Sequence, residues 1–142
     1  MNTSDNMTIL LIEDDDVAAE SVMRSLNKAG IQFPVVWAED GIEGLEILRE
    51  RHATRKVPRP RLLLVDLNMP RMNGIEFLQE LRSDADLKDE VVFVLTTSDD
   101  DNDRSRAYDE NVAGYMVKSN VGPQFAKLVS LLQSYQLAVK LP

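Results

Sequence analysis

The chain has no cysteine and only one histidine among its 142 residues. Without cysteine it can form no disulfide, no thiol nucleophile and no cysteine metal site. The single histidine, His52, cannot build a metal site alone, and we expect it to be an exposed loop residue. No apolar run reaches about 18 residues, so we expect no membrane-spanning helix. The polar residues 1–7 lack the apolar core of a signal peptide, and the cytoplasm is the expected location.

Positive charge is also scarce, because 16 lysines and arginines stand against 24 aspartates and glutamates, for a formal net charge of −8. This balance argues against nucleic acid or an anionic membrane as a direct partner, and it favours a small cation or a basic protein surface. Hydrophobic residues make up 44% of the chain, which is enough to bury a core. The length predicts one domain over residues 1–142, with a disordered N-terminus at residues 1–6.

Five short apolar segments alternate with five amphipathic ones. The predicted strands are 7–12, 35–38, 62–66, 91–95 and 115–117, and the predicted helices lie at about 16–28, 42–48, 75–81, 100–110 and 125–135. The third strand has no apolar–polar alternation, which is typical of a central strand covered on both faces. Because helical crossovers between parallel strands are right-handed, the pattern predicts an α/β fold. We expect a doubly wound (βα)5 sandwich with strand order 2-1-3-4-5.

Polar side chains follow four of the predicted strands at the edge where such sheets bind ligands. Glu13 and Asp14 follow the first strand, Asp66 ends the third, Thr96 follows the fourth and Lys118 follows the fifth. An isolated aspartate at a strand end would be interpreted as the cap of a turn. The company of the other four side chains favours a shared site instead.

Glu13, Asp14 and Asp66 would repel one another if all three were ionised in one crevice. A hard divalent cation removes this conflict, and Mg²⁺ takes oxygen ligands in octahedral geometry while keeping several waters. We expect Asp14 and Asp66 to be direct ligands, with the main-chain carbonyl of Asn68 as a third. Glu13 would act through a water molecule.

With a metal in place, one carboxylate oxygen of Asp66 stays free to attack phosphorus, as in aspartyl-phosphate enzymes. The equatorial oxygens of a transferred phosphoryl group must be neutralised. Mg²⁺, the Lys118 ammonium group and the Thr96 hydroxyl group would supply this from three sides. The strand-end residues therefore predict phosphoryl transfer to Asp66.

Four motifs at the strand ends carry a resemblance to a known family. They are Ile12-Glu13-Asp14, Val65-Asp66-Leu67-Asn68-Met69-Pro70-Arg71-Met72-Asn73-Gly74, Leu95-Thr96-Thr97 and Tyr115-Met116-Val117-Lys118. In this order and spacing the chain resembles the CheY-like receiver domain of two-component response regulators, which has a flavodoxin-like fold. The resemblance covers about residues 8–135 and leaves residues 136–142 as a C-terminal extension.

The resemblance implies that Asp66 accepts a phosphoryl group from a sensor histidine kinase in a Mg²⁺-dependent reaction. Thr96 and Lys118 would read the phosphate, and Tyr115 would be the aromatic switch residue. The protein would be a signalling phosphoacceptor with slow self-catalysed phosphorylation and dephosphorylation, not a conventional enzyme. Because no output domain is recognisable after the last predicted helix, the signal would pass to a downstream protein or a phosphotransfer partner.

One position departs from the family pattern. The family usually has Lys-Pro after the fifth strand, with a cis peptide, whereas this chain has Lys118-Ser119. A cis bond costs about 2.5–4 kcal/mol before a non-proline residue and about 0.5–1 kcal/mol before proline, so the sequence leaves this peptide open. The Lys-Ser ending and the Thr-Thr-Ser after the fourth strand resemble single-domain regulators that pair with phytochromes. A bacteriophytochrome is therefore one candidate kinase.

Two rival functions fit parts of the pattern. A haloacid-dehalogenase-type phosphatase also uses a strand-end aspartate, but it needs an acidic residue two positions later, where Asn68 cannot donate a proton. A pseudo-receiver binds partners without being phosphorylated. Such domains typically lose the acceptor, the acidic pair or the lysine, and this chain keeps them all. The pseudo-receiver is the alternative that we retain.

Two other segments bear on partners. The basic segment Arg49–Arg61 predicts a solvated loop, with a docking patch for an acidic partner as the alternative. Near the C-terminus, more apolar residues occur than one helix can bury against its own domain. They are Leu128, Leu131, Leu132, Tyr135 and Val139 near helical spacing, with Leu137 and Leu141 off that stripe. We expect a homodimer through the fourth helix, fifth strand and fifth helix, and a frayed tail is the alternative.

Overall fold

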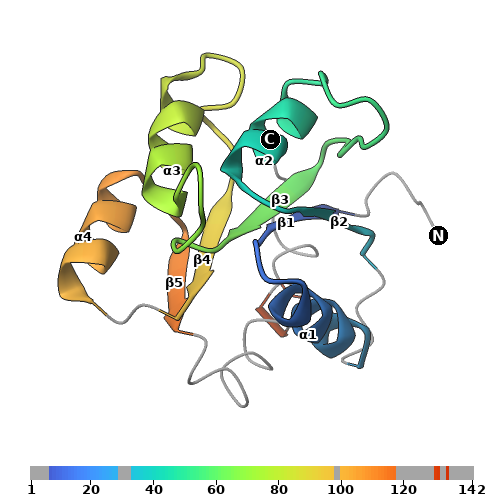
Figure 1. Ribbon diagram of the computed structural model, residues 1–142, viewed down its shortest axis with the longest axis horizontal. Helices are drawn as coiled ribbons and strands as arrows, with labels where there is room; N and C mark the ends of the chain where they lie inside the picture. The colour runs from blue at the N-terminus through green and yellow to red at the C-terminus, as the bar shows by residue number, and fades with distance from the viewer. Residues whose placement is uncertain (1–6, 29–32, 98–99, 118–129, 132–133, 135–142) are drawn as a thin grey trace.

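The computed structural model describes residues 7–28, 33–97, 100–117, 130–131 and 134. Its strands form a parallel five-stranded sheet in the order β2-β1-β3-β4-β5, which confirms the predicted order (Figure 1). The strands are β1 (Thr8–Ile12), β2 (Val35–Ala38), β3 (Arg61–Val65), β4 (Val92–Thr96) and β5 (Gly114–Val117), and the helices are α1 (Asp16–Lys28), α2 (Gly41–Leu48), α3 (Gly74–Ser83) and α4 (Asp101–Asp109). The predicted fifth helix falls largely outside the described residues. Among those residues, no helix is long and apolar enough to cross a membrane.

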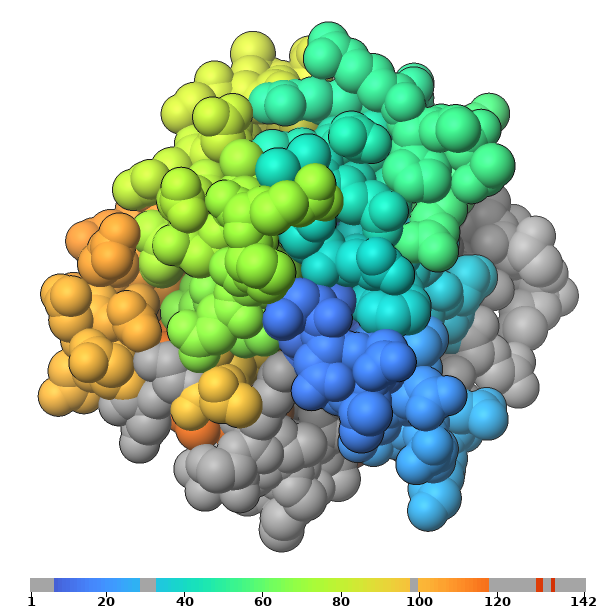
Figure 2. Space-filling model, in the orientation of Figure 1, coloured from blue at the N-terminus to red at the C-terminus, as the bar shows by residue number. Residues whose placement is uncertain are grey.

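Helices cover both faces of the sheet. α1 lies on one face, and α2 and α3 lie on the other (Figure 1). The surfaces of α2 and α3 adjoin in the space-filling view (Figure 2). Leu62 and Leu64 of β3 pack in the core on the α1 face, whereas Leu63 and Val65 pack in the core beneath α2 and α3. All residues of β3 are buried, which explains why its sequence shows no polar alternation. The doubly wound α/β class is therefore confirmed.

Short polar side chains begin the helices that follow the strand ends. Asp15 Oδ1 accepts a hydrogen bond of 2.9 Å from an N–H in the first turn of α1. Asp40 caps α2, Asp100 caps α4, and Asn73 forms a reciprocal capping box with Glu76 at α3. Each such cap contributes about 1 kcal/mol. The caps fix the ends of the strand-to-helix loops, and these loops carry the candidate site.

A buried ion pair closes the amino edge of the sheet. Arg61, the first residue of β3, donates to both carboxylate oxygens of Glu90 at 2.8 and 2.9 Å. Its remaining terminal nitrogen donates to the carbonyl of Val57 at 2.9 Å. The side chains of Arg61 and Glu90 are only 6% and 2% exposed. The expectation of a solvated basic segment is therefore wrong for Arg61, because its planar guanidinium group forms a bidentate pair with the carboxylate of Glu90, which is distant in sequence.

Other basic residues of the same segment are also engaged within the fold. Arg49 pairs with Asp84 at 3.0 Å, and Arg55 pairs with Glu43 at 3.0 Å. His52 Nδ1 accepts hydrogen bonds from two main-chain N–H groups of its own loop, and its side chain is only 16% exposed. The expectation of an exposed histidine is therefore wrong. These contacts favour a structural role for the loop over a docking patch.

Candidate functional site

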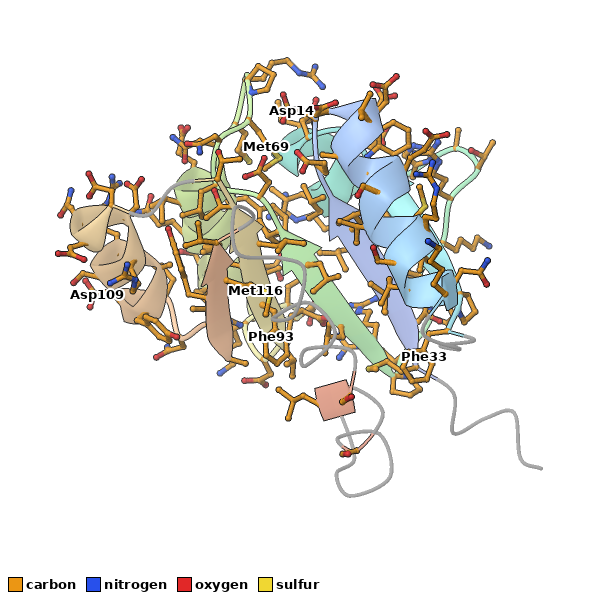
Figure 3. All side chains as sticks on the ribbon, turned by 90° about the horizontal axis from the view of Figure 1, so that it is seen from below. Asp14, Phe33, Met69, Phe93, Asp109 and Met116 are labelled. Atoms are coloured by element: carbon orange, nitrogen blue, oxygen red, sulfur yellow. The ribbon has the colours of Figure 1, made fainter. Side chains whose placement is uncertain are left out.

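Three carboxylates converge at the carboxyl edge of the sheet. The last residues of β1 and β3 are direct neighbours, so Glu13 and Asp66 follow at adjacent strand ends. One carboxylate oxygen from each of Glu13, Asp14 and Asp66 lies within 4.8 Å of the others. Glu13 and Asp66 are buried, whereas Asp14 is exposed. Figure 3 shows Asp14 and Met69, from the β1–α1 and β3–α3 loops, at the same end of the sheet.

Main-chain contacts on both sides hold Asp66. Its N–H donates to the carbonyl of Ile12 at 3.0 Å, which extends the sheet one residue beyond β3. The first turn of α3 comes so close that a Cβ added at Gly74 would lie 2.5 Å from the Asp66 carbonyl oxygen. Only glycine permits this approach. The N–H of Asn68 donates to Asp66 Oδ1 at 3.3 Å, and this contact orients the carboxylate.

The side chain of Asn68 connects the β3–α3 loop to β4. Its Nδ2 lies 3.4 Å from Oγ1 of Thr96 and 3.3 Å from Oγ1 of Thr97. Thr96 ends β4 and is fully buried, at 0% exposed. Strand pairing places Val117 of β5 beside Thr96. Lys118, the predicted phosphate-binding residue that follows Val117 in the chain, lies outside the described residues. The residues brought to one edge are therefore Glu13, Asp14, Asp66, Asn68 and Thr96.

Tyr115, the expected switch residue, lies on β5 beside Val94 of β4. Its half-buried ring packs against the core beneath α2 and α3. The guanidinium carbon of Arg104, from α4, lies 5.7 Å from the ring centroid, within reach of a cation–π interaction. The Tyr115 ring therefore connects the edge strand β5 to α4.

The donor set of the acidic edge fits a divalent cation. Three ionised carboxylates within 4.8 Å of one another repel, and the burial of Glu13 and Asp66 strengthens that repulsion. A hard divalent ion such as Mg²⁺ or Mn²⁺ relieves the repulsion, and carboxylate oxygens are among the ligands these ions prefer. The exposure of Asp14 leaves the cluster open to an ion from solvent.

The sequence matches the profile of a known protein family. A profile of the response regulator receiver domain matches residues 9–130. The chain belongs to this family. The receiver domain is 34% identical over 135 residues to the response regulator Rcp1 of Synechocystis sp., and the match covers 94% of this chain and 92% of Rcp1. It is 32% identical over 137 residues to FilR2, a probable methanogenesis regulatory protein of Methanothrix harundinacea, over 96% and 88% of the two chains.

Solved receiver structures agree over the same length. The phosphorylated cyanobacterial phytochrome response regulator RcpA matches with a TM-score of 0.81 at 33% identity, covering 96% of this chain and 99% of RcpA. The Mn²⁺-bound form of Rcp1 matches with a TM-score of 0.79 at 33% identity, again covering 96% and 99%. The predicted resemblance to CheY-like receiver domains, and within them to phytochrome-associated regulators, is confirmed.

Arg71 forms an ion pair beside the site of this receiver domain, and we predicted no role for it from the sequence. It has a left-handed φ of 65°, and its Nε donates to Asp40 Oδ2 at 2.9 Å, with a second contact from a terminal nitrogen. Burial raises the pKa of Asp40, but the Glu43 N–H and the Arg71 guanidinium outweigh it and leave the pKa below its usual value. The ion pair attaches the β3–α3 loop, which carries Asn68, to the start of α2.

Trp37 is the second such residue. It lies on the edge strand β2, and its indole Nε1 donates to the main-chain carbonyl of Glu13 at 2.7 Å. A half-buried tryptophan usually finds an acceptor for its N–H, so the residue type was a signal. The identity of that acceptor depends on β2 lying beside β1, which the local sequence around Trp37 does not encode.

Proposed function

We propose that this receiver domain is a phosphorylation-controlled switch in a two-component phosphorelay, with Asp66 as the acceptor. An Asp66 carboxylate oxygen forms a bond to the phosphorus of a phosphohistidine on a sensor kinase. The nitrogen–phosphorus bond breaks, and the released imidazole takes up a proton. One observation carries the proposal: Asp66 belongs to a cluster of three carboxylates at the carboxyl edge of a receiver sheet.

Mg²⁺ is the cation that we propose for this cluster. Asp14 and Asp66 are the direct carboxylate ligands, the Asn68 carbonyl is a further ligand, and Glu13 acts through water. When bound, the ion neutralises charge on the phosphoryl oxygens. The closeness of the carboxylates supports this assignment, as does the Mn²⁺-bound form of the related Rcp1, because Mn²⁺ and Mg²⁺ share a preference for oxygen ligands.

Thr96 and Lys118 contact the phosphoryl group and convert its presence into a change of shape. The Thr96 hydroxyl moves toward phosphorylated Asp66 and leaves room for Tyr115 to turn toward the core. The surface formed by α4, β5 and the fifth helix then changes, and a downstream protein or phosphotransfer partner reads it. The buried position of Thr96 and the half-buried ring of Tyr115 support this sequence of events.

A bacteriophytochrome is our candidate kinase, because the cyanobacterial phytochrome response regulator RcpA is 33% identical to this chain. Histidine kinases take their phosphoryl group from ATP, so we place the reaction in the cytoplasm. Without a kinase, the domain would gain and lose the phosphoryl group slowly by its own catalysis.

We place the receiver core at about residues 8–135, which the family match over residues 9–130 supports. The alternative, a pseudo-receiver, predicts no phosphate on Asp66.

Replacing Asp14 with alanine should weaken Mg²⁺ binding by about tenfold or more, because the change removes a direct ligand. Isothermal titration of the unphosphorylated protein measures this affinity. Asp16→Ala is the matched control, since Asp16 is also exposed and begins α1 but lies outside the cluster. The control should bind Mg²⁺ as the wild type does. An unchanged affinity in Asp14→Ala would remove Asp14 from the ligand set.

We also propose a homodimer that uses the surplus apolar residues near the C-terminus, which lie outside the described residues apart from Leu131. Light scattering should find a dimer for the full chain and a monomer for a version that ends at Ser134. The physical reason is that a symmetric contact buries the same apolar tail twice. A monomeric full chain, phosphorylated or not, would refute the dimer. A shortened chain that still dimerises would show that the tail is not what holds the pair together.

A further inference from the structure

Trp37 reaches the acidic edge from the neighbouring strand. Its backbone lies beside Leu11 of β1, and its half-buried ring packs against the core on the α1 face. From there the indole Nε1 donates to the Glu13 carbonyl at 2.7 Å, which is a short, well-formed hydrogen bond. Asp14 is the next residue along the chain, so the contact lies one peptide away from an expected metal ligand.

Both peptide groups of Glu13 are tied to β2. The Glu13 N–H donates to the carbonyl of Ala38 at 3.0 Å, and the Glu13 carbonyl accepts from Trp37. Because a peptide unit is planar, fixing the Glu13 carbonyl also fixes the N–H and Cα of Asp14. On the other side of Asp14, the Asp15 side chain caps α1. The Asp14 side chain therefore starts from a backbone position that Trp37 helps to define.

Trp37 is itself held from the opposite side of its strand. Its main-chain carbonyl accepts a hydrogen bond from the guanidinium group of Arg55, and the same guanidinium nitrogen binds Glu43 at 3.0 Å. With its backbone in the sheet and its ring in the core, the indole is a preorganised donor. Preorganisation matters here because Mg²⁺ demands near-ideal octahedral geometry from its ligands.

We propose that Trp37 is a positioning residue for the metal site: its indole N–H orients the Glu13–Asp14 peptide and so places the Asp14 carboxylate for a divalent cation. This inference rests on the Mg²⁺ site of the proposed function. Loss of the donor weakens metal binding and leaves the phosphoacceptor, Asp66, untouched. A hydrogen bond of ordinary net strength corresponds to about a two- to tenfold loss of Mg²⁺ affinity.

Calorimetric Mg²⁺ titration of the full chain, comparing wild type, Trp37→Phe and Val36→Ala, tests the proposal. Phenylalanine keeps an aromatic ring but removes the N–H. Val36 lies on the same strand but packs in the opposite core, so Val36→Ala loosens β2 without touching Glu13. We expect Trp37→Phe to bind Mg²⁺ about two- to tenfold more weakly and Val36→Ala to bind it as the wild type does. With a small phosphodonor, Trp37→Phe should need more Mg²⁺ to reach the same maximal phosphorylation rate.

A second substitution separates the effect of the hydrogen bond from that of packing. Because the chain contains only one tryptophan, a tryptophan analogue incorporated during biosynthesis replaces Trp37 alone. Biosynthetic replacement of Trp37 by benzothienylalanine exchanges the N–H for sulfur and keeps the bicyclic shape, and it should reproduce the loss of affinity. Unchanged Mg²⁺ affinity in both Trp37 replacements would overturn the inference alone. An equal loss in Val36→Ala would overturn it too, since the effect would then come from a loosened strand. A wild-type protein that binds no Mg²⁺ would overturn the proposed function together with the inference.

Discussion

The variant Asp66→Asn should accept no phosphoryl group, either from a kinase or from a small phosphodonor. The amide keeps the shape of the carboxylate but lacks its nucleophilic oxygen. The fold should persist, because the change removes no packing volume. Without Mg²⁺ the variant should even unfold at a higher temperature than the wild type, since it removes one of three carboxylates that lie within 4.8 Å of one another. Intact mass measures the phosphorylation, and circular dichroism measures the unfolding.

Asp109→Asn is the matched control for this experiment. Asp109 is exposed at the end of α4, and Figure 3 shows it far from Asp14 and the acidic edge. The control should be phosphorylated like the wild type. Wild-type labelling of Asp66→Asn would contradict the assignment of the acceptor. A lower unfolding temperature for metal-free Asp66→Asn would contradict the repulsion that we infer within the cluster.

The second large effect is on stability and concerns the buried pair at the other edge of the sheet. Arg61→Met should lower the free energy of unfolding by about 3 kcal/mol, because it leaves the Glu90 carboxylate buried without its bidentate partner. Arg59, which lies 3.3 Å from Glu90 and is 45% exposed, compensates only in part. Urea unfolding monitored by circular dichroism measures the difference.

Two further variants make the result specific. In Arg61→Met combined with Glu90→Leu, most of the lost stability should return, because apolar residues can replace a buried ion pair at little cost. Arg24→Met removes an exposed partner of Glu20, with side chains 66% and 71% exposed, and it should change stability by less than about 1 kcal/mol. A single Arg61→Met variant as stable as wild type, or a double variant no better than the single one, would refute this account of the pair.

The sequence predicted the sheet because its strands carry their own local signal. The buried run of β3 and the position of Asp15 before α1 could be interpreted without knowing any distant neighbour. Arg61 and His52 could not. Each lies in a segment whose composition is that of a solvated loop. Arg61 is buried against Glu90, and the His52 side chain is only 16% exposed and lies 3.6 Å from Glu43, a partner that only the finished fold brings near. Local composition does not encode such pairings.

The acidic edge could also be predicted from the sequence, because it depends on the strand order. Once the strand order is predicted, the ends of β1 and β3 are neighbours, so Glu13, Asp14 and Asp66 must meet. Trp37 and Arg71 were missed as members of the site, because their contacts cross between loops and strands. Trp37 donates to a main-chain carbonyl, and any residue type could supply that acceptor. Arg71 reaches Asp40 from a left-handed backbone conformation that the residue type of Arg71 does not predict.

Locating the phosphoryl group tests the central claim most directly. The wild-type protein is incubated with a small phosphodonor, with Mg²⁺ or with a chelator, and its peptides are then mapped by mass spectrometry. The account predicts one phosphoryl group, on Asp66, formed with Mg²⁺ and absent after chelation. A phosphoryl group on another residue such as His52, labelling of Asp66 that is indifferent to the chelator, or no labelling at all would contradict it.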